Sequence, residues 1–171
     1  MDILTKYKYQ VVNDFLEEDE FNNAYIKWIN KFGESNQSKR DFLWSVFQRL
    51  NMGIAKKFGI SIEMYQYQRE LYLIMFSFLI EENRNTKHIR RSIHFCDLMK
   101  ADLSDYKQEV VFIATKCCEE CDKINGQIIS LEIAKKTQPL PYSKCKRKTG
   151  CICCYGFKAV EDEKGRLIMK S

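Results

Sequence analysis

Apolar residues recur at three- and four-residue spacing through the first 105 residues, which is the period of an amphipathic helix. Gly33 and Gly59 each follow such a stretch, where glycine can end a helix in a left-handed conformation. Ser38 and Ser61 each precede one and are predicted N-caps. No proline interrupts this region. The pattern predicts a bundle of about five helices, at residues 3–15, 21–32, 38–58, 61–82 and 86–99.

The pattern changes after residue 105. Residues 110–115 are β-branched and aromatic and predict a strand, with residues 127–129 as its partner across an Asn-Gly turn. Ser130 is expected to cap a short helix that runs to residue 136. Residues 155–160 and 166–169 predict a final hairpin. We therefore expect an α+β fold, with a helical domain over 1–105 and a small β module over 106–171.

Length and charge agree with two units of different composition. A chain of 171 residues suits one domain with a small appended module. Residues 106–171 hold 13 basic and 8 acidic residues and so carry the whole net charge of +5. The longest nearly uninterrupted apolar run, residues 71–80, is about half of what a membrane span requires. Residues 1–6 lack a signal-peptide pattern, so we expect no membrane association and a cytoplasmic location.

Cysteine is the strongest compositional anomaly. The chain has eight cysteines, of which seven lie between Cys117 and Cys154. In a reducing cytosol, clustered thiols are more often metal ligands than disulfides. Disulfide pairing is the alternative if the protein is exported.

The spacing of these thiols predicts a zinc site. Cys118 and Cys121 form a C-x2-C pair that can hold one ion from a tight turn, and a second cysteine group follows about 24 to 30 residues later. An all-sulfur ligand set favours zinc. No histidine follows His94, whereas catalytic zinc sites usually recruit His, Asp or Glu, so we expect the zinc to be structural. A module of about 66 residues with few large apolar groups needs a cross-link such as a bound metal to be stable.

Four ligands are needed, and more thiols than that are present. Cys118 and Cys121 are the best-supported pair of ligands, and Cys145 with either Cys151 or Cys153 is expected to complete the set. Cys117 and Cys154 each stand beside another cysteine and are expected to point away from the site. They are core fillers, or ligands if two ions share bridging thiolates. The candidate ligands are therefore Cys118, Cys121, Cys145, Cys151 and Cys153.

Residues 110–157 resemble a known module. The C-x2-C pair, the Asn-Gly turn, the short helix after Ser130, the Pro-Leu-Pro segment at 139–141 and the last cysteine group are similar to the zinc-binding cysteine module that closes the minor head proteins of Mu-like phages. The module also occurs in uncharacterised bacterial proteins. Tyr142 stands where it usually has histidine, and residues 146–150 are an insertion. The resemblance implies a phage or mobile-element protein, in the host cytoplasm or in a virion.

Basic residues provide an alternative function. Two stretches can contact phosphates in a nucleic acid, and they contain Arg90, Arg91, Lys144, Lys146, Arg147 and Lys148. His88 and His94 are six residues apart, cannot chelate together from one helix, and are expected at the surface or half-buried.

No serine-hydrolase, P-loop or zinc-protease motif occurs, and no small-molecule substrate is evident. The sequence thus favours a non-enzymatic zinc-binding interaction or assembly protein with a protein partner. The alternative is a nucleic-acid-binding accessory protein.

Overall fold

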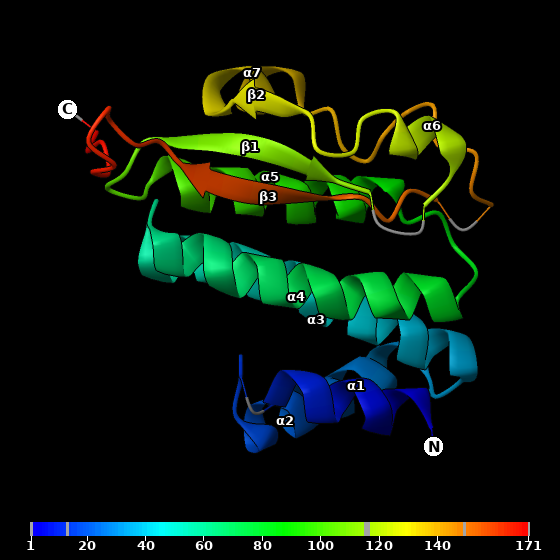
Figure 1. Cartoon of the computed structure of the whole chain (residues 1–171). Helices are drawn as coiled ribbons and strands as arrows, with labels where there is room; N and C mark the ends of the chain where they lie inside the picture. Colours follow the sequence, from blue (N-terminus) through cyan, green and yellow to red (C-terminus); the bar gives the residue numbers. More distant parts are fainter. Residues whose placement is uncertain (1, 13, 115–116, 149, 171) are drawn as a thin grey trace.

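The computed structural model describes residues 2–12, 14–114, 117–148 and 150–170, and it has the predicted α+β architecture (Figure 1). The first half contains α1 (Ile3–Val12), α2 (Glu18–Phe32), α3 (Asn36–Phe58), α4 (Ile62–Glu81) and α5 (Lys87–Asp102). The second half contains β1 (Gln108–Ile113), α6 (Glu119–Asp122), β2 (Ile128–Ser130), α7 (Leu131–Thr137) and β3 (Cys154–Ala159). Within the described residues, none of the helices combines the length and the apolar character that crossing a bilayer requires.

The ends of the helices follow the predicted caps, with one exception. Gly33 and Gly59 terminate α2 and α3 with φ of 77° and 60°, and the Ser61 hydroxyl accepts from Met64 N–H at the start of α4. The prediction for Ser38 was wrong, because Ser35 caps α3 one turn earlier. The Ser38 hydroxyl instead donates to the Gly33 carbonyl at 2.8 Å. It thus ties the start of α3 to the end of α2.

Aromatic side chains form the centre of the helical bundle. Tyr7 of α1, Phe47 of α3 and Phe78 of α4 are almost fully buried and meet edge to face, with ring centroids 5.3 to 6.1 Å apart. Such edge-to-face contacts add to the gain from apolar burial. The buried residues of this core come from the first four helices and from α5 as far as Cys96, and Met99 of α5 packs against them as a half-buried side chain.

Helix α5 also contributes to a second core. Leu98 and Ala101, from its last turns, are buried with Val110 and Phe112 of β1 and with residues of α7. Figure 1 shows the sheet lying along α5, with the other bundle helices on the opposite side of that helix. The helix runs three residues beyond the predicted end at Met99, and this extension supplies Ala101 to the second core.

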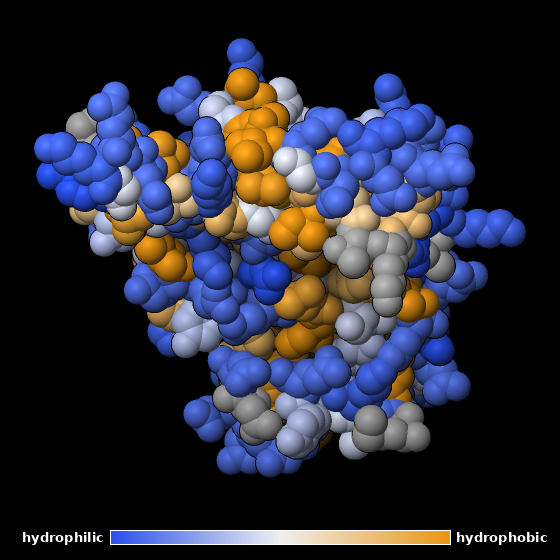
Figure 2. All heavy atoms as spheres, in the orientation of Figure 1, coloured by the Kyte–Doolittle hydropathy of each residue, from blue (hydrophilic) through white to orange (hydrophobic). Residues whose placement is uncertain are grey.

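The sheet is antiparallel, with strand order β2-β1-β3. The predicted pairing of the first two strands is confirmed, with Val110 opposite Ile129. Alternate residues of β1 face the core, so Val110 and Phe112 are buried. The other face carries Ile113 and Ile128, which are 39% and 48% exposed. Figure 2 shows hydrophobic atoms at the surface among the hydrophilic side chains that cover most of this view.

The predicted final hairpin forms only in part. Strand β3 pairs with β1 over its whole length, and Asp162 closes the following turn by accepting from the N–H groups of Lys164 and Arg166. The returning arm makes only isolated bridges, Glu161 to Leu167 and Tyr106 to Met169. Pairing with β1 places Tyr155 in the second core, whereas Leu167 and Met169 stay exposed. Thr115, at the end of the predicted first strand, lies outside the described residues.

His94 was expected at the surface or half-buried and is in fact buried, whereas His88 is exposed. Its ring packs edge to face on Tyr155 of β3, with centroids 5.3 Å apart. Burial, together with the nearby positive charges of Arg90 and Arg69, lowers the pKa of His94 to about 4. The folded protein therefore holds this imidazole neutral at the point where α5 meets the sheet.

We predict that His94 makes folding stability fall as the pH falls from about 6.5 towards 4. In this window the unfolded chain, with a histidine pKa of about 6.5, binds a proton that the folded protein excludes. Relative to His94→Phe, the wild type is expected to lose about 2 kcal/mol of unfolding free energy between pH 7 and pH 5. Urea unfolding of both proteins at each pH measures this difference, and parallel pH profiles would contradict the prediction.

Candidate metal centre

Six cysteines gather at one end of the sheet, although they come from separate segments of the chain. Cys117 and Cys118 follow β1, and Cys121 lies in α6. Cys145, Cys151 and Cys153 come from the segment between α7 and β3. Figure 1 shows α6 and this segment together at the same end of the molecule.

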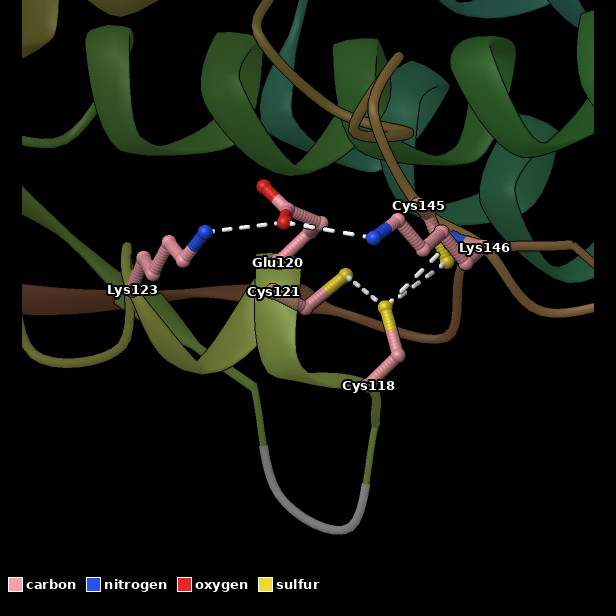
Figure 3. Close-up of polar contacts among 6 residues, drawn as sticks. All are labelled: Cys118, Glu120, Cys121, Lys123, Cys145 and Lys146. Carbon is pink, nitrogen blue, oxygen red and sulfur yellow. Dashed lines mark hydrogen bonds and ion pairs between the residues drawn. The ribbon is translucent and has the colours of Figure 1, made fainter.

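Helix α6 gives the C-x2-C pair its geometry. Cys118 is in an extended conformation immediately before the helix, and Cys121 lies in its single turn, so their Sγ atoms are 3.6 Å apart. The Sγ atom of Cys145 lies 3.9 Å from that of Cys118. Figure 3 shows the three sulfurs directed towards one another, with Cys145 arriving from a different segment. A Zn–S bond of about 2.3 Å places the sulfurs of a tetrahedral site about 3.8 Å apart, so the spacing suits such an ion.

The sulfurs form two groups of four, and either group can hold a metal ion. The first comprises Cys117, Cys118, Cys121 and Cys145, and the second comprises Cys117, Cys121, Cys151 and Cys153. Within each group, all Sγ atoms lie within 4.8 Å of one another. The structure thus brings together all five candidate ligands, but distributes them over two groups that share Cys121.

Cys117 is outside the five candidate ligands, because sequence reasoning admitted it as a ligand only if two ions share bridging thiolates. It was expected to point away from the site because it precedes Cys118, yet its Sγ atom belongs to both groups and lies 3.5 Å from that of Cys153. Side chains of adjacent residues diverge in an extended segment, but here Cys117 and Cys118 belong to the same group of four. The number of clustered thiols was the available signal. Cys154 is exposed and belongs to neither group, as expected.

Disulfides do not account for this arrangement. All eight cysteines are free thiols, and the contacts of 3.5 to 3.9 Å between their sulfurs are far longer than a disulfide bond of about 2.05 Å. Cys121, Cys151 and Cys153 are buried within the second core. The cluster is therefore part of the interior of the β module.

Backbone amides favour the thiolate form at the exposed side of the cluster. The N–H of Lys146 donates to Cys118 Sγ at 3.4 Å, and this contact, together with the N–H of Cys121, lowers the pKa of Cys118 to about 7. Burial and contact with neighbouring sulfurs instead raise the pKa of Cys121 and of Cys153. A bound cation would compensate the charge of buried thiolates, because metal ligation requires the deprotonated form.

Arg90 of α5 places a positive charge against the cluster. It is 9% exposed, donates to the Cys151 carbonyl, and stacks on Phe76, with its guanidinium carbon 4.7 Å from the ring centroid. Burial lowers the pKa of Arg90, while the nearby Cys151, Cys145 and Cys117 favour its charged form. This residue was a candidate phosphate contact, but its position makes it a counter-charge for the sulfurs.

The other predicted basic residues are spread over the surface around the cluster. Arg91 is exposed and donates to Gln138 at 3.0 Å, and Lys146 lies 3.5 Å from Glu120 (Figure 3). Lys144 and Lys148 are exposed, and Arg147 is half-buried.

Beside the cluster lies a cleft of about 600 Å³. It is lined by the loop between α4 and α5 and by the segment after α7, and its sulfur-bearing wall includes Cys145 and Cys151. Among the described residues, the basic side chains that line it are those of Arg84, Lys87, Arg90 and Lys148, and none of the lining residues is an aspartate or glutamate. Only two of the six predicted phosphate contacts, Arg90 and Lys148, therefore share this concave surface.

Compared with known proteins, the chain matches no family model, no curated protein and no solved structure. The function is therefore inferred from the site itself.

We predict that Arg90→Met weakens metal binding while keeping the apolar contact with Phe76. Loss of the buried cation beside the thiolates is expected to lower the affinity for Zn²⁺ by roughly 10- to 100-fold, since a charge-assisted contact contributes about 1.5–3 kcal/mol. Competition with a chromophoric chelator measures this affinity. Arg91→Met, at the exposed neighbouring position, is the matched control. Equal affinities of the two variants would show that Arg90 does not stabilise the bound metal.

Proposed function

We propose that this protein is a non-enzymatic interaction or assembly protein whose C-terminal module is held together by zinc. The observation that carries the proposal is the convergence of cysteine sulfurs from separate segments into two groups of four, each compact enough to hold one ion. Neither group contains a His, Asp or Glu ligand among the described residues. Thiolate ligands alone favour zinc over the harder divalent cations, which prefer oxygen.

A structural role follows from the ligands and from their burial. A catalytic zinc keeps one position for water or substrate, whereas four thiolates complete the tetrahedron. Cys121, Cys151 and Cys153 are at most 4% exposed, so the centre of the cluster is closed to a substrate. The metal would join the end of β1 and α6 to the segment before β3.

The β module has few other means of holding these segments together. Between α7 and β3 the described chain forms no regular helix or strand, and Leu140 and the cysteines supply its buried residues. Loops of this kind gain stability from a metal that cross-links them. The zinc would therefore define the shape of the module.

A protein partner is supported by the uncovered face of the sheet. Ile113 and Ile128 are exposed on this face, while α5 and α7 cover the other. An apolar surface on a small module is suited to association. The resemblance to the cysteine module of Mu-like phage head proteins extends the proposal to an assembly role, in the host cytoplasm or in a virion.

We predict that removing zinc unfolds the C-terminal module and leaves the helical bundle folded. Both tryptophans, Trp28 and Trp44, belong to the bundle, so their fluorescence reports on it, whereas proteolysis after residue 105 reports on the module. Chelation is expected to open the module to trypsin with little change in fluorescence. Cys121→Ser should behave like the chelated protein, and Cys154→Ser like the wild type.

Metal analysis of the purified protein completes this test. The proposal requires at least one tightly held zinc ion per chain, and Cys121→Ser should lower the zinc content while Cys154→Ser leaves it unchanged. Protein that is fully protease-resistant and metal-free would contradict a structural zinc.

The basic cleft favours nucleic-acid binding as a second candidate function. Its four cationic side chains lie beside the cysteine cluster without an acidic neighbour in the lining, as a phosphate-binding groove requires. Lys148 is exposed there, as is Lys87 at the start of α5.

We predict that, if this candidate is right, the protein binds a fluorescent single-stranded oligonucleotide with an affinity that falls steeply as salt is raised. Lys87→Glu and Lys148→Glu should each weaken binding several-fold in fluorescence anisotropy at low salt. Lys136→Glu, an equal charge change on the exposed side of α7, should leave the affinity nearly unchanged. Equal losses in all three variants would indicate a diffuse charge effect and count against the cleft.

A further inference from the structure

The two groups of sulfurs overlap in a specific way. Cys117 and Cys121 belong to both groups, Cys118 and Cys145 only to the first, and Cys151 and Cys153 only to the second. Among the described residues, no group of three or more ligand atoms contains Cys118 or Cys145 together with Cys151 or Cys153. The six sulfurs therefore extend over more than the coordination sphere of one ion.

This overlap is the arrangement of two tetrahedra that share one edge, because such a pair has six corners, of which two are common. We propose that the cluster binds two zinc ions, with the Cys117 and Cys121 thiolates bridging them. Cys118 and Cys145 complete the coordination of one ion, and Cys151 and Cys153 complete that of the other. The inference rests on the proposed zinc-binding function and extends it from one ion to two.

Distances in both halves agree with this assignment. In the first group, the Sγ atom of Cys118 is 3.6 Å from the bridging Cys121 and 3.9 Å from Cys145. In the second group, the Sγ atom of Cys153 is 3.5 Å from the bridging Cys117. Each value is close to the edge of about 3.8 Å expected for zinc in a sulfur tetrahedron.

The burial of the cysteines agrees with their assignment as bridging or terminal ligands. Cys121 is fully buried, as expected for a bridging sulfur with an ion on each side, and it is fixed by the turn of α6. If the first group held the single ion, Cys151 and Cys153 would bind no metal. Both are buried, at 4% and 2% exposed, and both lie within 4.8 Å of Cys117 and Cys121, which would bind that ion. A second ion gives every clustered sulfur a role.

The charge of the centre also permits two ions. Six thiolates with two Zn²⁺ ions carry a net charge of −2, the same as four thiolates with one ion, so the second ion adds no charge to neutralise. The Arg90 guanidinium lies beside both halves, since it donates to the carbonyl of Cys151 and lines the same cleft as Cys145. One buried cation therefore serves a centre that spans both groups.

Zinc stoichiometry decides the inference. Purified full-length protein is reconstituted with Zn²⁺ under reducing conditions, freed of excess metal by gel filtration, and analysed by mass spectrometry for zinc per chain. Two ions per chain support the binuclear centre, and one ion overturns it while leaving the proposed function intact. No bound ion overturns both.

Matched variants locate the two ions. Cys118→Ser and Cys153→Ser should each lower the content from two ions to about one or fewer, because each removes a terminal ligand of a different ion. Cys154→Ser, directly beside Cys153 but outside both groups, should retain two. A Cys153→Ser protein with undiminished zinc content would overturn the assignment.

X-ray absorption of the wild-type protein provides a measurement that needs no variant to fold. Zinc ions in two tetrahedra with a common edge lie about 3 Å apart, so the zinc-edge spectrum should contain a zinc–zinc contribution in addition to sulfur at about 2.3 Å. A first shell of four sulfurs without a zinc neighbour would overturn the binuclear centre.

Discussion

The contact among the cysteine sulfurs at one end of the sheet is the interaction on which the C-terminal half depends. It joins the end of β1, the single turn of α6 and the segment before β3, which have few other buried side chains in common. Thiolates packed this closely repel one another, and a divalent cation removes that repulsion. The proposed zinc would thus set the course of the chain between the sheet strands.

Helix α5 links this centre to the rest of the molecule. It packs in the helical bundle, and Leu98 and Ala101 of its last turns pack under the sheet, while Arg90 reaches the cysteine cluster from the same helix. His94, one turn further on, fills the contact with Tyr155 as a neutral ring. The two cores of the molecule therefore meet along one continuous helix.

Regular elements could be predicted because their patterns are local. Helical periodicity, the caps at Gly33, Gly59 and Ser61, and the pairing of β1 with β2 all follow from residues close in sequence. The predictions were wrong where contacts between residues that are not neighbours in the sequence determine the structure. Ser38 turns back to Gly33, the C-terminal arm forms isolated bridges in place of a regular strand while β3 pairs with β1, and His94 is covered by a strand about 60 residues later.

The cysteine spacing by itself determined that a cluster able to hold a metal ion is expected in the C-terminal half with Cys118 and Cys121 as members, because a C-x2-C turn directs two sulfurs to one point. Only the tertiary structure decided the place of Cys117 and the division of six sulfurs into two overlapping groups. The reason is physical: two adjacent cysteines can both belong to one cluster only if other ligand sulfurs, from another part of the chain, pack against them. Here Cys145, Cys151 and Cys153 approach, from a segment that is distant in the chain and close in space.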